Sequence, residues 1–170
     1  KEAIASEYAS LEKNKVFSKP MNLPTGFKAI DTKLVLKIKE SSGSDVDRIF
    51  KARLCGKGFR QTFGVDYFDT YSPVATYNTL RFLLTILATL DYEIDTVDVI
   101  TAFLLASLKE EIYIKIPDGY PGNHSNSNKV LRLLKSLYGL KQAPRDWNYE
   151  IHNYLLSIGF SSTETDKCCL

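Results

Sequence analysis

Apolar residues recur along the chain at two different intervals, and each interval predicts a different kind of element. In three stretches they recur every three or four residues, which places them on one side of a helix. Asn78 or Thr79 is suited to cap the second of these helices, and Gly159 is suited to end the third. The predicted helices cover residues 1–14, 79–90 and 144–158.

Strict alternation of apolar and polar residues predicts strands elsewhere. Residues 33–39 and 48–58 alternate on either side of the polar stretch ESSGSDVD, so we expect a β-hairpin. A second pair of strands is expected over residues 112–116 and 129–135. Residues 93–105 also favour a strand because they are rich in Ile, Val, Thr and Phe. Helices mixed with antiparallel strands predict the α+β class.

Charge changes the picture of the first hairpin. The net charge of the 170 residues is +2, yet nine basic and four acidic residues lie between Phe27 and Gln61, a local charge of +5. Such a basic face favours a polyanionic partner. Lys51 and Arg53 could bind a triphosphate, because Arg offers a planar fork and Lys a point charge. Alternatively, these side chains are only solvated and discourage pairing at the sheet edge.

Two carboxylates interrupt the predicted strand over residues 93–105. Asp95 and Asp98 point to opposite faces of a straight strand, so they cannot share a metal ion. From the residues alone, Asp98 is either a strand-end charge or a ligand of Mg²⁺, which takes one or two carboxylates together with substrate phosphates. A two-metal site would need a further acidic contributor.

The stretch SLYGLKQAPRDW, residues 136–147, combines residues with special backbone conformations and hydrogen-bonding groups. Gly139 permits a tight backbone, Pro144 is suited to start a helix, and the amide of Gln142 is both donor and acceptor. This stretch is either part of a site or a loop that leads into a helix with Trp147 in the core.

Other features of the composition bear on location. The apolar run from Phe82 to Leu90 is far shorter than the roughly 20 residues of a membrane-spanning helix, and no signal peptide leads the chain. The three cysteines lack zinc-binding or CxxC spacing. We therefore expect an intracellular protein in a reducing setting, with no membrane partner.

Taken together and in order, KARLCGKGFRQ, YSPVATYNTLR, VDVITAFL and SLYGLKQAPRDW resemble the reverse transcriptase of copia-type retrotransposon Pol polyproteins. The resemblance covers essentially the whole chain. It implies a right-hand polymerase fold, with residues 1–90 mainly in the fingers and 91–170 forming part of the palm with an antiparallel sheet. The implied activity is RNA-directed DNA polymerase, which adds deoxynucleotides to a primer 3′-hydroxyl with two Mg²⁺ ions.

The resemblance also implies roles for individual residues. Asp98 matches the family's first metal-binding aspartate and would hold Mg²⁺ together with the backbone carbonyl of Val99. Phe103 would crowd a ribose 2′-hydroxyl and so favour deoxynucleotides through a clash. Further nucleotide-binding residues would be Lys51, Arg53, Thr101, Ala102 and Gln142.

In this family a Tyr-Val-Asp-Asp turn follows the segment that here reads DKCCL, and it supplies the other two carboxylates. We therefore expect a fragment, truncated before that turn and inactive alone. Its partners would be an RNA or DNA template with primer, deoxynucleoside triphosphates, and the downstream palm, thumb and ribonuclease H region of the same polyprotein. The implied location is a cytoplasmic particle or the nucleus.

The chain departs from the family pattern at several positions, among them Leu34, Thr76 and Ile100. Such drift is typical of an element no longer under selection. Two alternatives therefore stay open: a noncatalytic nucleic-acid-binding remnant of a decayed element, and an inert expressed fragment.

Overall fold

A computed structural model gives the fold and describes residues 1–39, 48–122 and 128–170. The predicted polar connection ESSGSDVD falls on residues 40–47, outside the described residues. The helices are α1 (Glu2–Lys13), α2 (Tyr77–Thr89), α3 (Ala102–Leu105) and α4 (Ala143–Ser157), with a short 3₁₀ turn over Gly58–Arg60. The strands are β1 (Met21–Asn22), β2 (Ala29–Ile30), β3 (Thr32–Lys39), β4 (Ile49–Gly56), β5 (Tyr113–Lys115) and β6 (Lys129–Arg132).

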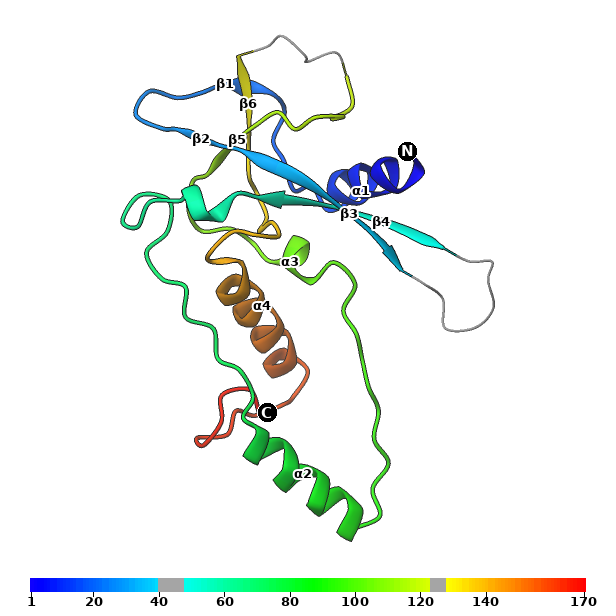
Figure 1. Cartoon of the computed structure of the whole chain (residues 1–170). Coiled ribbons are helices and arrows are strands. Elements are labelled where there is room, and N and C mark those ends of the chain that lie inside the picture. Colours follow the sequence, from blue (N-terminus) through cyan, green and yellow to red (C-terminus); the bar gives the residue numbers. More distant parts are fainter. Residues whose placement is uncertain (40–47, 123–127) are drawn as a thin grey trace.

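The strands form two sheets that lie at one end of the molecule (Figure 1). The predicted hairpin is confirmed as an antiparallel β3–β4 ribbon in which Leu34 faces Leu54 and Lys37 faces Lys51. The other sheet has the order β1-β6-β5-β2, and its β5–β6 pair confirms the second predicted hairpin.

The expectation of a purely antiparallel sheet is wrong in one place. Strands β2 and β5 run parallel, with Ala29 opposite Tyr113. A short connection forces two strands to be antiparallel. Between β2 and β5, however, the chain forms β3, β4, α2 and α3, so the connection leaves either direction possible. The class is therefore mixed α and β with a mixed sheet.

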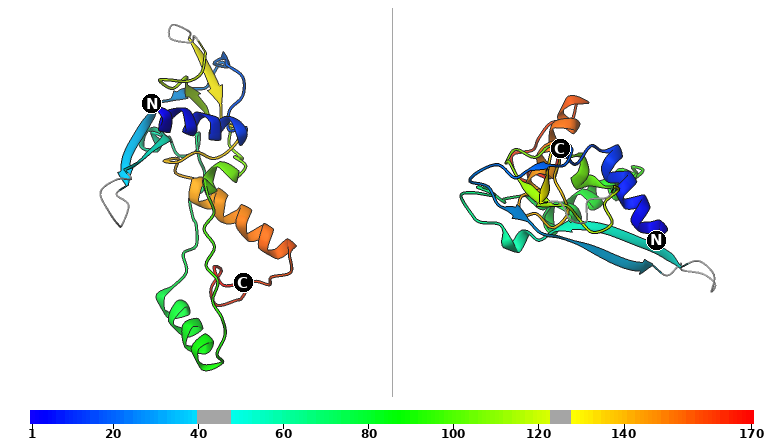
Figure 2. Two further views of the ribbon diagram at one scale, coloured as in Figure 1. Left: turned by 90° about the vertical axis from the view of Figure 1, so that its right-hand side faces the viewer. Right: turned by 90° about the horizontal axis from the view of Figure 1, so that it is seen from above.

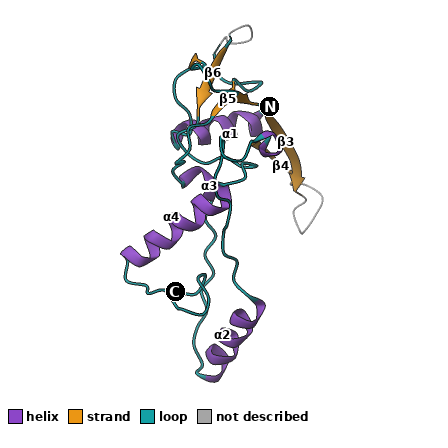
Figure 3. Cartoon of the chain, turned by 90° about the vertical axis from the view of Figure 1, so that its left-hand side faces the viewer, coloured by secondary structure: helices purple, strands orange, loops and turns teal. Residues whose placement is uncertain are grey.

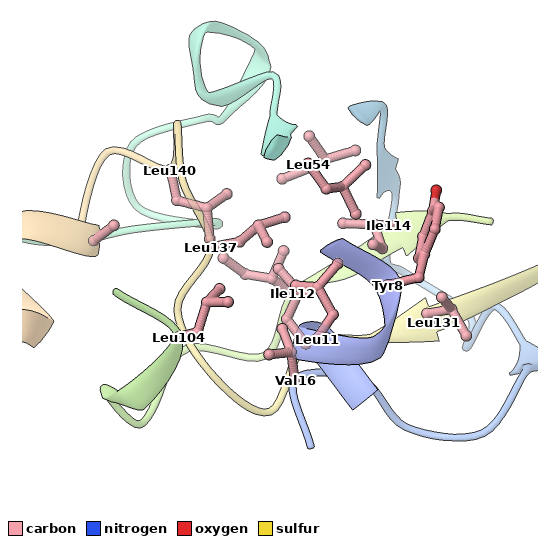
Figure 4. Close-up of a cluster of buried hydrophobic side chains, with 13 residues drawn as sticks. Tyr8, Leu11, Val16, Leu54, Leu104, Ile112, Ile114, Leu131, Leu137 and Leu140 are labelled. Atoms are coloured by element: carbon pink, nitrogen blue, oxygen red, sulfur yellow. The ribbon is translucent and has the colours of Figure 1, made fainter. Parts of the chain in front are cut away.

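A hydrophobic core joins α1, the four-stranded sheet, Leu54 near the C-terminal end of β4, and the loop before α4 (Figure 4). Burial of these apolar side chains is the main stabilising contribution to the fold. The largest fully buried side chains include Leu11, Leu54, Leu104, Ile114, Leu131 and Leu137.

The β3–β4 ribbon projects beyond this core (Figure 3). Its predicted apolar face exists, because Leu34, Leu36 and Ile38 share a side with buried Leu54 and Ala52. However, Leu36 is 66% exposed and Ile38 is 52% exposed, so the core covers this apolar face only at the end that carries Leu34 and Leu54.

Helix α2 lies at the opposite end of the molecule from the sheets (Figures 1 and 2). Its predicted cap is corrected: Thr76 caps the helix by accepting a hydrogen bond from the Thr79 amide at 3.1 Å. The predicted apolar stripe is present in the sequence, but no residue of α2 is buried. The C-terminal segment reaches this helix through Asp166, which accepts a hydrogen bond from the Thr76 amide at 3.1 Å.

The strand predicted over residues 93–105 is wrong, and its last residues, Ala102–Leu105, form helix α3. The chain from Tyr92 to Val99 has no regular secondary structure, and Asp95 and Asp98 are both exposed. The β-rich composition alone does not make a strand, because a strand needs a neighbour for its backbone groups. In the described part of the chain, no helix is long and apolar enough to cross a bilayer.

Candidate functional site

The loop before α4 lies tightly against the end of β4. The Gly56 amide donates to the Tyr138 carbonyl at 2.7 Å. Gly139 has a φ of +82°, and a β-carbon there would overlap the Gly56 carbonyl oxygen. A β-carbon on Gly58 would likewise overlap the Gly139 carbonyl. Glycine is required at this junction because the two backbones approach without room for side chains.

The ring of Tyr138 brings together side chains from two other elements. Phe103 of α3 lies edge-on to it, with ring centroids 5.2 Å apart and an interplanar angle of 72°. The guanidinium carbon of Arg53 lies over the same ring, 5.5 Å from its centroid. Burial raises the pKa of Tyr138, and the positive charge of Arg53 opposes this shift. We call Arg53, Phe103 and Tyr138 the Tyr138 cluster.

The backbone turns sharply just before Phe103. Thr101 has φ +56° and ψ +37°, a left-handed conformation that is unusual for a β-branched residue. Its carbonyl accepts a hydrogen bond from the Leu104 amide at 2.8 Å and so starts α3. Thr101, Ala102 and Phe103 are all half-buried. This left-handed turn directs Phe103 toward Tyr138.

The two predicted phosphate contacts occupy different positions along β4. Arg53 lies opposite Val35 and contacts Tyr138, whereas Lys51 lies opposite Lys37. Two residues along a strand correspond to about 7 Å, so Lys51 lies closer to the far end of the ribbon. Both side chains are exposed. The geometry thus places Arg53 in the Tyr138 cluster and leaves Lys51 in a basic patch with Lys37.

Asp98 lies in the unpaired segment that leads to the Thr101 turn, and Val99 beside it is half-buried. Within residues 1–39, 48–122 and 128–170, no three His, Cys, Asp or Glu side chains gather closely enough to hold a metal ion. An exposed carboxylate suits one position in the oxygen shell of Mg²⁺. Asp98 therefore fits as one ligand, but the described residues do not complete a magnesium site.

Gln142 occupies a different environment from the one predicted for it. It is 0% exposed, its carbonyl accepts from the Gln61 amide at 2.9 Å, and its own amide donates to the Asp66 carbonyl at 3.0 Å. Gln61 in turn accepts from the Lys141 backbone amide at 2.8 Å. Gln142 thus joins the loop before α4 to residues 61–66, and its nucleotide contact stays a prediction.

A charged group beside Gln142 holds the start of α4. Arg145 binds Glu110 at 2.9 Å and Asp146 at 2.6 Å. Burial raises the pKa of Asp146, and the hydrogen bond from Arg145 opposes that shift. A buried charge is tolerable only when it is paired in this way. Arg145 and Asp146 of the motif therefore form ion pairs at the start of α4, and Trp147 is only half-buried.

Sequence reasoning missed Tyr138 as the residue on which Phe103 and Arg53 converge. Its signal was its place beside Gly139 in the stretch 136–147. Sequence spacing gives no sign that residues 53, 103 and 138 meet, because their contacts depend on the tertiary fold.

Comparison with known proteins identifies the family. A family model described as reverse transcriptase (RNA-dependent DNA polymerase) matches residues 14–169. The chain belongs to the reverse transcriptase family. Its similarity to transposon Pol polyproteins also confirms the predicted resemblance to copia-type elements.

Three relatives show the range of this reverse transcriptase similarity. The Pol polyprotein from transposon TNT 1-94 of Nicotiana tabacum is 39% identical over 98% of the chain and 12% of its own length. That from transposon RE1 of Arabidopsis thaliana is 37% identical over 84% of the chain and 10% of its own length. The Ty1-H Gag-Pol polyprotein of Saccharomyces cerevisiae is 37% identical over 76% of the chain and 7% of its own length.

The chain therefore spans roughly a tenth of the length of these curated relatives. No solved structure matches it.

Proposed function

We propose that this chain supplies the fingers (mainly residues 1–90) and part of the palm (residues 91–170) of an RNA-directed DNA polymerase. The observation that supports this best is the Tyr138 cluster. It joins a cation to two aromatic rings from three segments far apart in sequence. A cation beside an aromatic wall suits a nucleoside triphosphate, which has both an anionic tail and a flat, apolar ring face.

In this proposal Arg53 binds the triphosphate, and Phe103 distinguishes deoxyribose from ribose. The guanidinium offers paired donors to phosphate oxygens, and it is exposed on the outward side of β4. Phe103 is backed by the Tyr138 ring, so it cannot retreat freely from a bulkier sugar. A ribose 2′-hydroxyl would therefore be excluded by a clash, as the family resemblance predicts.

Magnesium is the proposed cofactor, and Asp98 with the Val99 carbonyl is its proposed contact on this chain. Bound magnesium would neutralise negative charge on the triphosphate and its leaving group. Further carboxylates must come from outside the described residues, because those residues gather no acidic cluster. The proposed enzyme is therefore the longer polypeptide, and the 170-residue chain alone is expected not to polymerise.

The β3–β4 ribbon is the proposed contact for the template and primer backbone. Lys37 and Lys51 lie directly opposite each other, an arrangement that costs stability unless an anion lies between them. The exposed face of the ribbon also presents Lys33 and Arg53. Phosphates of a nucleic acid would relieve this repulsion without reading its sequence.

The test is magnesium-dependent primer extension by a Pol polypeptide that carries this chain in its own reading frame. We expect extension with the unchanged sequence and a loss of at least 100-fold with Asp98→Asn, which removes the charge but keeps the size. Asp95→Asn is the matched control, and it should retain activity.

Two results would contradict the proposal. Extension by the 170-residue chain alone, lost on Asp98→Asn, would show that no further carboxylates are needed. Template binding without extension in the longer polypeptide would instead favour the noncatalytic remnant.

A further inference from the structure

Helix α1 packs against β4, the strand that carries Arg53. Besides the apolar side chains of Tyr8 and Leu11, this contact includes Glu7, whose carboxylate accepts a hydrogen bond from the Leu54 backbone amide at 2.8 Å. Leu54 is completely buried, and Glu7 is 8% exposed. A buried carboxylate that binds a strand amide is uncommon on an amphipathic helix, where charged residues normally face solvent.

The carboxylate of Glu7 also interacts electrostatically with Arg53 of the Tyr138 cluster. Burial raises the pKa of Glu7, whereas the Leu54 amide and the positive charge of Arg53 lower it. Leu54 directly follows Arg53 in β4, so the hydrogen bond fixes the backbone from which Arg53 projects. Glu7 therefore connects α1 to the residue that contacts Tyr138, and through Tyr138 to Phe103.

Strand β4 is held from two other sides. Strand β3 pairs with it along its full length, and the Gly56 amide donates to the Tyr138 carbonyl at 2.7 Å. Glu7 is the contact that α1 adds at Leu54, between these two attachments. Loss of the acceptor would leave a fully buried amide without a partner, and β4 would have to shift toward another acceptor or water.

We propose that Glu7 is a positioning residue for nucleotide selection: it fixes β4 so that Arg53 and Tyr138 hold Phe103 in place. This inference rests on the function proposed above, in which Phe103 excludes ribonucleotides. Glu7 itself contacts no substrate. Its effect on selection passes through Leu54 and Arg53, which makes it separable from a general contribution to folding.

Two substitutions separate these roles. Glu7→Ala removes the acceptor, whereas Glu7→Gln keeps an amide oxygen that can accept from Leu54 and removes only the charge. Glu12→Ala on the exposed side of α1 is the matched control. A purely structural role would reduce the active fraction and lower kcat for every nucleotide equally, leaving the ratio between nucleotides unchanged.

The first measurement is kcat/KM for a deoxyribonucleotide and its ribonucleotide in the polymerising polypeptide. We expect Glu7→Ala to lower the deoxy-to-ribo ratio at least fivefold and to raise the deoxynucleotide KM. Glu7→Gln and Glu12→Ala should stay within twofold of the unchanged protein. A ratio unchanged in Glu7→Ala would overturn the inference.

The second measurement needs no catalysis. In the 170-residue chain, amide hydrogen exchange at Leu54 should be accelerated at least tenfold by Glu7→Ala and be restored by Glu7→Gln. Equal exchange in all three proteins would overturn the inference, because the hydrogen bond would then contribute nothing.

Phe103→Ala, measured in parallel, distinguishes a failure of the role of Glu7 from a failure of the proposed role of Phe103. If Phe103→Ala lowers the deoxy-to-ribo ratio and Glu7→Ala does not, the inference fails and the proposed function stands. If Phe103→Ala leaves the ratio unchanged, the proposed role of Phe103 fails, and the inference fails with it.

Discussion

Gln142 illustrates how one residue can be read in two ways. Its side chain could serve a nucleotide, but in the fold both ends of its amide are bound to Gln61 and Asp66. Buried polar groups are stabilising only while they keep their partners, and their loss is costly. Replacement of Gln142 is therefore expected to affect the stability of the fold first.

We expect Gln142→Ala to lower the free energy of unfolding by about 1–3 kcal/mol, because the Gln61 amide and the Asp66 carbonyl lose a buried partner. Urea unfolding of the 170-residue chain measures this change. Asn153→Ala, at an exposed position of α4, is the control and should change stability by about 0.5 kcal/mol or less. Unchanged stability combined with weaker nucleotide binding would restore the predicted contact.

Among the elements, those defined by local pattern could be predicted and those defined by distant partners could not. The β3–β4 ribbon, α1 and α4 follow directly from spacing. The parallel β2–β5 pair could not be foreseen, because Ala29 and Tyr113 are distant in sequence. The same limit explains the missed Tyr138 contacts. The role of Phe103 came only from the family resemblance, which also favoured the magnesium ligand over the strand-end charge at Asp98.

The junction between β4 and the loop before α4 can be tested with two glycines. Gly139 and Gly26 both have positive φ, but a β-carbon on Gly26 would meet nothing within 4 Å. Gly26→Ala should therefore cost only the backbone strain, about 1 kcal/mol. Gly139→Ala should cost about 3 kcal/mol or more, because overlap with the Gly56 carbonyl is added. Equal losses in denaturant unfolding would show that the two backbones are not in close contact.

At the scale of the whole molecule, positive charge is concentrated on a ribbon that projects from the core. The chain's net charge of only +2 conceals this asymmetry. Lys33, Lys37, Lys51 and Arg53 share the outward face of β3 and β4. A nucleic acid that binds there releases counterions, so its affinity must depend on salt.

We expect the logarithm of the primer-template association constant to fall against the logarithm of salt concentration with a slope of about −3, one phosphate for each of Lys33, Lys37 and Lys51, since Arg53 is assigned to the triphosphate. Lys51→Ala should make the slope shallower by about one. Lys19→Ala, outside the ribbon, should leave it unchanged. Fluorescence anisotropy over a salt series provides the measurement, and a flat dependence would exclude the electrostatic contact.

The Tyr138 cluster also has a consequence for biosynthesis. Its members leave the ribosome in the order Arg53, Phe103 and Tyr138, and each is separated from the next by at least 35 residues of chain. Native contacts between residues so distant in sequence form slowly, because loop closure precedes any compensating interaction. The proposed nucleotide pocket therefore cannot exist before Tyr138 has been synthesised. Until then the ribbon, which is synthesised before Phe103 and Tyr138, can attract nucleic acid before any selection of nucleotides is possible.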